Sequence, residues 1–479
     1  MATVSILKFG AKGDGVTDNT VAIQKTIDYA KANGLDVHVP TGTFVHKNMI
    51  NLHSGVDIYG SGTASVLKAV GASTNDNQAI KLSGSGGGIH NIALDSDATT
   101  RASTGDSAKI WVMGASNFTI EGVTIKNSMS AGILVTYGSS YGKIINNKIN
   151  STNADSIHMS SGSHHITVSG NYITNPHDDG IAVVSYERNG TQVHDITITN
   201  NTVMNNVWGR NISVVGGYNV NISKNTVDGN KAGFAGVYIS GESSYDTYGV
   251  RNVTVADNII KNVGGATTGH GAVMIYNSTG YMVEDIFIKH NQIMYAAKNS
   301  VMIRGSKIDD ITISYNLFEK SAAAPVAISG TATDVRQISN TTSRTTWSTY
   351  AAPEGSEDAG LPVVDPAAEA PEDSAPADAP AALDPSREEI SLDQAALGEE
   401  VSWVPSADAA PYVAAWTSAA PVTEVQAVRA SAPEPAEAEY FPAAPAEAAA
   451  EAPAAEPDYT VVLDGIPPIE IAGIPLLLA

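Results

Sequence analysis

At 479 residues, the chain is long enough for two or three ordinary domains or for one long repeat domain with an appendage, and its lack of cysteine excludes disulfides and thiolate metal sites. The net charge of −23 belongs to one region, because 25 of the 50 acidic residues but two of the 27 basic residues follow Tyr350. The first 350 residues are near neutral and show no basic stripe, so nucleic acid is not an expected partner.

Residues 1–50 differ from the rest of the chain and are predicted to form an N-terminal cap and the first coil of a repeat structure. A glycine-rich turn from Phe9 to Asp18 precedes apolar residues at helical spacing, with Asp18 as the expected N-cap. A helix here would cover the core and strand edge that a first coil exposes. We see no Sec signal peptide and no apolar stretch long enough to span a membrane.

Residues 51–345 contain short strands of alternating apolar and polar residues, such as His165-Ile166-Thr167-Val168 and Asp195-Ile196-Thr197-Ile198. An asparagine recurs every 24 to 33 positions, at Asn147, Asn171, Asn201, Asn225, Asn258, Asn291 and Asn316. A turn residue at this period, with two or three short strands between, is typical of a parallel β-helix. We therefore expect an all-β fold in which the asparagines form a ladder at a corner that tolerates left-handed backbone geometry.

Residues 346–479 are predicted to be a disordered, acidic, Ala/Pro-rich tail. Of the 22 prolines in the chain, 19 follow Tyr350, and such a segment cannot bury enough apolar area to offset its chain entropy. The end, from Tyr459 to Ala479, becomes apolar again and resembles the uncleaved signal of bacterial type I secretion substrates. This favours a secreted bacterial protein with type I secretion machinery as a partner; a low-complexity extension is the alternative.

Two clusters of carboxylates and imidazoles lie one predicted coil apart. Asp155 and His158 form the first, and His177, Asp178 and Asp179 form the second. Because coils stack at about 4.8 Å, we expect the three carboxylates on one face. Crowding disfavours joint ionisation, so one carboxyl can stay protonated beside a charged one, as cleavage of a glycosidic bond requires. The alternative is that all three aspartates are ordinary turn residues.

Three segments carry a family resemblance: Asn153-x-Asp155, Asp178-Asp179-Gly180-Ile181-Ala182 and Gly209-Arg210-Asn211-Ile212-Ser213-Val214. They are similar to motifs of the polygalacturonase and rhamnogalacturonase family of glycoside hydrolases. The resemblance implies a right-handed parallel β-helix and inverting hydrolysis, with Asp178 as general acid and with Asp155 and Asp179 holding the attacking water.

The chain departs from this family at two places. Arg210 stands where the family has histidine, and the family's Arg-Ile-Lys is missing near Gly236-Val237-Tyr238-Ile239-Ser240. Galacturonan is therefore not the expected substrate. The opening Phe9-Gly10-Ala11-Lys12-Gly13-Asp14-Gly15 also resembles pectate lyase-like enzymes, alginate C5-epimerases and phage tailspikes, and it indicates architecture rather than reaction.

Six residues are predicted to contact substrate: His158, His177, Tyr186, Trp208, Arg210 and Glu242. The alternative for each is a solvated, loop or core residue. His158, Tyr186 and Arg210 would also suit abstraction of a proton from C5 of a uronate. We interpret Gly269-His270-Gly271 as a loop. No metal site and no cofactor are predicted, and the use of Ca²⁺ is left open.

These features predict a secreted bacterial glycoside hydrolase that acts on a polysaccharide such as an exopolysaccharide. One alternative is a lyase or C5-epimerase acting on a uronate polymer, and another is a non-catalytic, glycan-binding β-helix of the tailspike type. New reducing ends, unsaturated products, altered epimer ratios or binding alone would separate these alternatives.

Overall fold

The computed structural model describes residues 2–71, 78–102, 105–230, 233–265 and 267–343. The chain divides into two units, Met1–Glu434 and Pro435–Ala479. The second unit and the predicted tail at 346–479 lie outside the described residues. The described residues all belong to the first unit.

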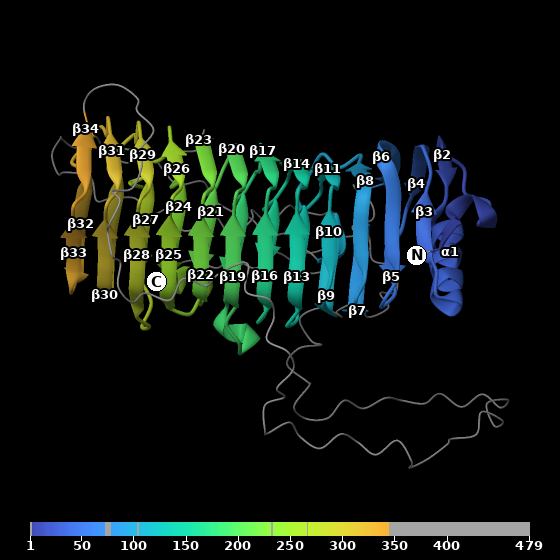
Figure 1. Ribbon diagram of the computed structural model, residues 1–479, viewed down its shortest axis with the longest axis horizontal. Helices are drawn as coiled ribbons and strands as arrows, with labels where there is room; N and C mark the ends of the chain where they lie inside the picture. Colours follow the sequence, from blue (N-terminus) through green and yellow to red (C-terminus); the bar gives the residue numbers. More distant parts are fainter. Residues whose placement is uncertain (1, 72–77, 103–104, 231–232, 266, 344–479) are drawn as a thin grey trace, which may run out of the picture. The chain divides into compact units, whose positions relative to one another are not determined.

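The described residues contain 34 strands, all joined by parallel pairing into one continuous sheet that is wound into three stacks. Figure 1 shows strands of successive coils side by side, in the order of the sequence. Three long strands, β6 (Asp57–Ala69), β8 (Gly88–Ser96) and β30 (Val301–Ser314), run through two stacks each, and β9 (Ile110–Ser116) of the first stack also pairs at Ser116 with β13 (Ser140–Ile145) of the second. The predicted parallel β-helix is thus confirmed.

The first stack contains β5 (Ile50–Leu52), β7 (Ile80–Ser85), β9 (Ile110–Ser116), β12 (Ile133–Thr136), β15 (Ile157–Met159), β18 (Ile181–Val184), β21 (Ile212–Val215), β24 (Val237–Gly241), β27 (Val273–Asn277), β30 and β32 (Val326–Ala332). The second contains β1 (Thr3–Ser5), β3 (Asp36–Val39), β6, β8, β10 (Thr119–Glu121), β13 (Ser140–Ile145), β16 (His164–Ser169), β19 (His194–Thr199), β22 (Tyr218–Ser223), β25 (Val250–Ala256), β28 (Val283–Lys289), β30 and β33 (Val335–Ile338). The third contains β2 (Asp14–Asp18), β4 (Gly42–His46), β6, β8, β11 (Thr124–Ser128), β14 (Lys148–Thr152), β17 (Tyr172–Thr174), β20 (Thr202–Asn206), β23 (Thr226–Asn230), β26 (Ile259–Lys261), β29 (Gln292–Met294), β31 (Leu317–Glu319) and β34 (Thr341–Ser343).

The core fills the inside of the coils. Alternate strand residues point inward, so the apolar residues of one coil lie above those of the next. In the second stack, for example, Ile166 is in register with Ile196, and Ile196 with Val220, and all three are buried. The register therefore fixes which side chains meet from coil to coil, both inside the helix and on its surface.

The predicted asparagine ladder is present. The side-chain oxygen of Asn171 accepts hydrogen bonds from the backbone N–H (3.0 Å) and the side-chain amide (2.9 Å) of Asn147. The same pair of bonds joins each ladder asparagine to the next as far as Asn340. The left-handed backbone belongs to the residue before each asparagine, such as Asn146 and Gly170, and not to the ladder residue itself.

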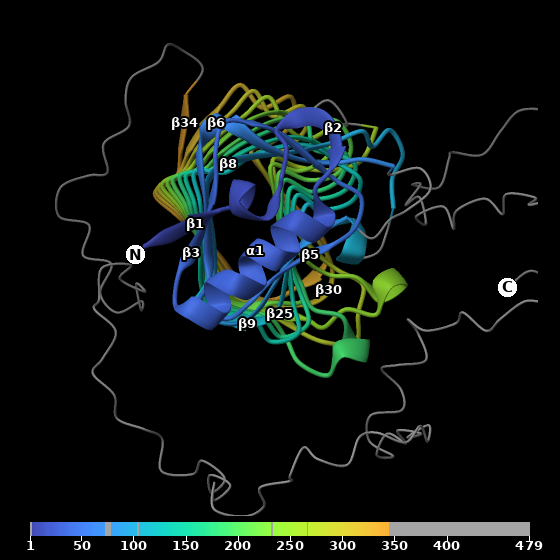
Figure 2. The ribbon, with the colours of Figure 1, turned by 90° about the vertical axis from the view of Figure 1, so that its right-hand side faces the viewer.

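Helix α1 (Thr20–Asn33) lies across the N-terminal end of the coils (Figure 2) and buries Ile23 and Ile27. Asn19 is its N-cap residue, one position later than the expected Asp18, whose carboxylate accepts from the backbone N–H of Thr20. Within the described part of the chain, four 3₁₀ helices lie in the loops: η1 (Ile6–Phe9), η2 (Gly105–Ser107), η3 (Glu187–Asn189) and η4 (Ser243–Tyr245).

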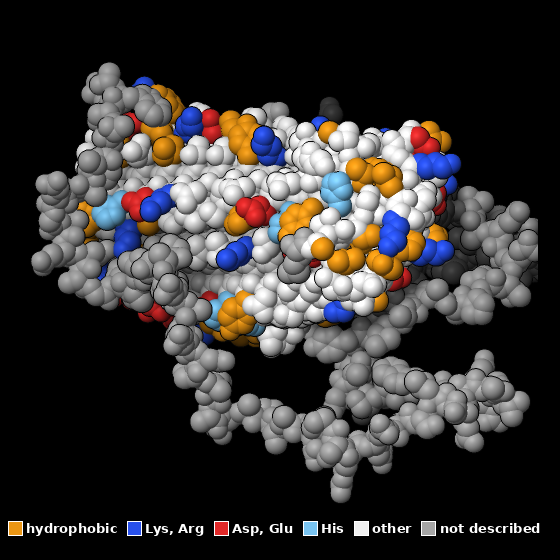
Figure 3. Space-filling model, turned by 45° about the vertical axis from the view of Figure 1, so that its right-hand side comes forward, with side chains coloured by type: hydrophobic (Ala, Val, Ile, Leu, Met, Phe, Trp, Pro, Cys, Tyr) orange, Lys and Arg blue, Asp and Glu red, His pale blue; other side chains and the backbone are white. Residues whose placement is uncertain are grey.

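Two surface features bear on partners. No helix among the described residues is long and apolar enough to cross a membrane. On the face in Figure 3, Lys and Arg side chains are dispersed among acidic and neutral ones and form no continuous stripe.

Candidate active site

The three predicted aspartates lie where chain segments enter the first stack. Ile157 of β15 is in register with Ile181 of β18. Asp155 and Asp179 each precede these isoleucines by two residues, so they occupy equivalent positions one coil apart. Arg210 precedes Ile212 of β21 in the same way, one coil further on. The repeat thus stacks two carboxylates and a guanidinium.

The structure brings the carboxylates of Asp155, Asp178 and Asp179 together. One oxygen from each lies within 4.8 Å of the others. Oδ1 of Asp155 accepts a hydrogen bond from the backbone N–H of Asp179 at 2.7 Å, which fixes the two coils relative to each other. Asp178 and Asp179 lie in a bend before β18, so these sequence neighbours do not point to opposite sheet faces as they would in a strand.

Glycine is required directly beneath this bend. Gly209 has a φ of 101°, and a Cβ at that position would lie 2.6 Å from the carbonyl carbon of Asp178. Only a residue without a side chain lets the two coils approach so closely. The family-like motif around Gly209 therefore supports the acidic cluster from below.

Asp179 is the most enclosed member of the cluster. Its Oδ1 accepts from the backbone N–H of Arg210 at 2.6 Å, and its Oδ2 accepts from the hydroxyl of Ser213 at 2.5 Å. Burial, with a contribution from the charge of Asp155, raises the pKa of Asp179 to about 6, although Arg210 and Ser213 oppose the shift. Near neutral pH this carboxylate is therefore ionised and held by fixed donors.

Asp178 meets a cation from a distant part of the chain. Its Oδ2 accepts a hydrogen bond at 2.6 Å from the guanidinium of Arg101, which belongs to a segment that follows β8. The side chain of Asn153 donates to the carbonyl oxygen of Thr100, which anchors that segment. Burial and the charges of Asp155 and Asp179 nevertheless raise the pKa of Asp178 well above its usual value. Asp178 is thus the carboxyl that most readily keeps its proton.

Arg210 is half-buried and paired. Its guanidinium donates to Glu242 at 2.6 Å, lies 3.8 Å from Asp179 and sits over the ring of Tyr238 at 4.4 Å. Burial disfavours its charge, but the carboxylates of Glu242 and Asp179 raise the pKa of Arg210 well above its usual value. Glu242 is itself buried and also accepts from the hydroxyl of Tyr238 at 2.8 Å. Glu242 therefore neutralises Arg210 and does not form an exposed cleft wall.

The chain's similarity to known proteins fits this arrangement. Residues 3–234 match the model of the family described as "Rhamnogalacturonase A/epimerase, pectate lyase-like". Over these residues the chain is similar to pectate lyase-like proteins, and its fold there is a parallel β-helix. The resemblance expected from the motifs is thus confirmed for the part of the chain that carries all three aspartates.

Individual relatives add detail about the fold. Over 59 residues the chain is 44% identical to the preneck appendage protein of Bacillus phage PZA, a match that spans 12% of this chain and 6% of that protein. The catalytic unit of a GH87 alpha-1,3-glucanase from Streptomyces thermodiastaticus is 19% identical, with a TM-score of 0.58, 72% of this chain covered and 70% of that one. The A-module of the mannuronan C-5 epimerase AlgE6 of Azotobacter vinelandii is also 19% identical, with a TM-score of 0.54, 71% of this chain covered and 100% of that one. At these identities the two structures show a shared fold.

The remaining predicted substrate residues differ in their surroundings. His158 is half-buried, and its Nδ1 lies 2.6 Å from Oδ2 of Asp155. Burial, with the charge of Asp155, raises the pKa of Tyr186 to about 12. His177 is exposed and its Nδ1 lies 3.1 Å from the carbonyl oxygen of Thr152, so it contributes to a turn. The ring of Trp208 lies 5.7 Å from that of Phe234.

Three residues near the site escaped sequence reasoning. Arg101 lies 77 positions from Asp178, so no spacing points to it. Ser213 belongs to a family-like motif, but its bond to Asp179 depends on the register. His270, interpreted as a loop residue, stacks on Tyr238 at 5.5 Å, and burial together with Arg210 lowers its pKa to about 3. A histidine between glycines carries no signal for such packing.

Proposed function

We propose that this protein is a polysaccharide-degrading glycoside hydrolase that uses carboxylate acid–base chemistry. The observation that carries the proposal is the meeting of three carboxyl groups from successive coils, with the pKa of Asp178 raised well above its usual value and with Asp179 held by fixed donors. One protonated and one ionised carboxyl are the pair that glycosidic cleavage needs.

In the proposed reaction, Asp178 gives its proton to the glycosidic oxygen as the bond to the sugar breaks. Asp155 and Asp179 accept hydrogen bonds from a water molecule and take up its proton as it attacks the anomeric carbon. Oδ2 of Asp178 lies beside Arg101, which stabilises the negative charge left after proton transfer. Each step balances with water as the only co-reactant.

The stereochemistry of the reaction is a sharp test of this scheme. Carboxyl groups of inverting enzymes are typically about 6.5–9.5 Å apart, whereas those of retaining enzymes are about 5–5.5 Å apart. Here the oxygens approach within 4.8 Å. We propose inversion because three carboxylates, rather than two, share the work and Asp155 and Asp179 bind the water jointly. NMR of the first anomer released checks this, and a retained configuration would replace the scheme with a covalent intermediate.

The charges also suggest a class of substrate. Glu242 already neutralises Arg210, so this guanidinium is not available to a uronate carboxylate. Three clustered carboxyl groups would repel a negative charge at the cleavage point. We therefore propose a neutral sugar there. Because a polymeric glycan is met outside the cell, we also propose that the protein acts extracellularly.

The decisive experiment is a digest of a panel of neutral and acidic polysaccharides by wild type and Asp178→Asn. Wild type should release new reducing ends from at least one polymer, and the variant should lose about 100- to 10,000-fold in turnover while binding the glycan. His177→Ala is the matched control, since His177 lies next in sequence but is exposed and should keep full activity. Undiminished turnover in Asp178→Asn would remove Asp178 from the mechanism.

One observation favours a second candidate, an epimerase or lyase that acts on uronates. The short contact between Nδ1 of His158 and Asp155 orients the ring and leaves Nε2 as a base, a pairing that suits proton abstraction from carbon. Exchange of the C5 hydrogen in heavy water, or ultraviolet absorbance of an unsaturated uronate, would identify this reaction. New reducing ends without either signal would support hydrolysis.

A further inference from the structure

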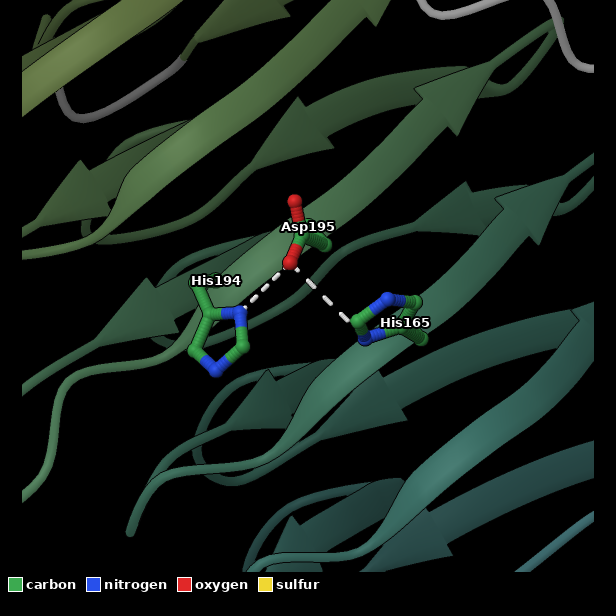
Figure 4. A group of neighbouring side chains, drawn as sticks. All are labelled: His165, His194 and Asp195. Carbon is green, nitrogen blue, oxygen red and sulfur yellow. Dashed lines mark hydrogen bonds and ion pairs between the residues drawn. The ribbon is translucent and has the colours of Figure 1, made fainter. Parts of the chain in front are cut away.

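A second cluster of side chains lies on the two coils that carry the acidic cluster, where their strands in the second stack begin. It consists of His165 at β16 and of His194 and Asp195 at β19, and one donor atom from each lies within 4.8 Å of the others. Nδ1 of His194 is 2.6 Å from Oδ2 of Asp195, and Nδ1 of His165 is 3.7 Å from the same oxygen. Figure 4 shows both imidazoles turned toward this one carboxylate oxygen.

The repeat explains why these residues meet. Ile166 is in register with Ile196, so His165 and Asp195 occupy equivalent positions in neighbouring coils, both with left-handed backbone at φ of 53° and 54°. The equivalent residue of the next coil is Asn219, and asparagine and aspartate accept this conformation readily. Histidine also accepts this conformation, as at His290, and the side chain of His165 points to the carboxylate of the next coil.

Neighbouring side chains hold the cluster in place. The amide of Asn219 donates to Oδ1 of Asp195 at 3.0 Å, so Oδ2 is the oxygen presented to the histidines. The ring of Tyr218 stacks on His194 at 4.7 Å, and the ring of Tyr141 lies 4.8 Å from His165. Supporting contacts of this kind orient the ligands of metal sites in proteins.

A fourth imidazole adds to the density of donor nitrogens. Nδ1 of His164 lies 2.8 Å from Nδ1 of His165, and its ring stacks on that of His194 at 4.9 Å. Two ring nitrogens at this distance must share one proton, whereas a cation at the cluster would take the lone pair of His165 directly. The crowding of nitrogen lone pairs thus favours a positively charged occupant.

We propose that His165, His194 and Asp195 bind a divalent transition-metal ion such as Zn²⁺. The bound ion would link two successive coils. Two imidazoles and a carboxylate suit Zn²⁺ and its neighbours, whereas Ca²⁺ and Mg²⁺ prefer oxygen ligands throughout. Ligand atoms around tetrahedral Zn²⁺ lie about 3.3–3.6 Å apart, so shifts of about 1 Å in the donor atoms, by side-chain rotation, would bring them to ligand distance. The side chains of His165, His194 and Asp195 are 44%, 24% and 33% exposed, so an ion can enter from solvent and keep a water ligand.

The test uses the full-length protein without a histidine tag, stripped with EDTA and titrated with ZnCl₂ by calorimetry. Wild type should bind one equivalent at this site and melt at a higher temperature with Zn²⁺, because an ion that binds the folded state stabilises it. His165→Asn and Asp195→Asn should each weaken Zn²⁺ binding at least tenfold and abolish the thermal shift. Both place asparagine where the repeat already accepts it, as at Asn219, so the fold should persist.

Asp155→Asn is the matched control, because it makes the same aspartate-to-asparagine change in the acidic cluster of the same coils and should leave Zn²⁺ binding unchanged. Co²⁺ should give visible absorption bands in wild type that are absent from His165→Asn and Asp195→Asn. Unchanged affinity in His165→Asn and Asp195→Asn would overturn the proposal. It would also be overturned if Zn²⁺ binding were lost in Asp155→Asn alone, or if Ca²⁺ bound this site as tightly as Zn²⁺.

Discussion

The acidic cluster at the first stack and the cluster of His165, His194 and Asp195 at the second stack, here called the histidine corner, arise from the same repeat and differ in their surroundings. Each places side chains of two successive coils at equivalent positions. In the first, the aspartates are largely buried and meet the guanidinium groups of Arg101 and Arg210. In the second, the imidazoles and Asp195 are open to solvent. A solenoid thus fixes which residues meet, and depth decides the chemistry that they can perform.

The largest expected difference between the two clusters is the effect of the same aspartate-to-asparagine substitution on turnover. Asp155→Asn is expected to reduce turnover about 100- to 10,000-fold, because it removes a carboxylate that holds the attacking water. Asp195→Asn should leave turnover within about twofold of wild type, because we assign Asp195 to metal binding alone. Steady-state rates of reducing-end release measure both. Equal losses would show that the two clusters work as one site.

The pH dependence of kcat/KM should show the influence of burial. Asp179 must be ionised, and its pKa is about 6, so the rate should fall about tenfold per pH unit below that value. Asp178 must be protonated, and its pKa is raised, so the rate should also fall at high pH as that proton is lost. A pH–rate profile checks the resulting bell shape. An acidic limb near pH 4 would mean that the pKa of Asp179 is not raised.

The thermal stability of the protein should also depend on pH through Asp178. Because the folded-state pKa of Asp178 is raised, its protonated form stabilises the fold at low pH, and this contribution is lost as pH rises through that pKa. Asp178→Asn lacks this loss and should melt a few degrees above wild type at pH 8 but not near pH 4. Calorimetric melts at the two values measure the difference. A variant less stable than wild type at pH 8 would show that the bond to Arg101 outweighs the repulsion.

The smallest expected effect concerns Arg101. Its charge lowers the pKa of Asp178, so Arg101→Gln should move the alkaline limb of the pH–rate profile to higher pH. The side chain of Arg101 is 40% exposed, so solvent screening should keep the shift below about one pH unit. Lys148→Gln, at an exposed cation of β14, should leave the profile unchanged. A shift to lower pH would contradict the assigned role.

The fold was predictable because its determinants repeat. The recurring asparagines set the length of a coil, and the spacing of Asp155 from Asp178 and Asp179 equals one coil, so their proximity could be inferred from the repeat length. Contacts made by loops could not be inferred in this way. Arg101 reaches Asp178 across several coils, and Glu242 turns inward to Arg210 although it lies in a polar insert. The histidine corner could have been noticed, since His165 and His194-Asp195 begin two copies of the same repeated phrase.

The asparagine ladder has a consequence for how such a chain can change over generations. Its bonds are alike whether neighbouring rungs are 24, 30 or 33 residues apart in sequence. The spacing of the rungs in space is therefore independent of the length of the loops between them. Insertions can enlarge a loop, or duplicate a whole turn of the spiral, without disturbing the rungs on either side.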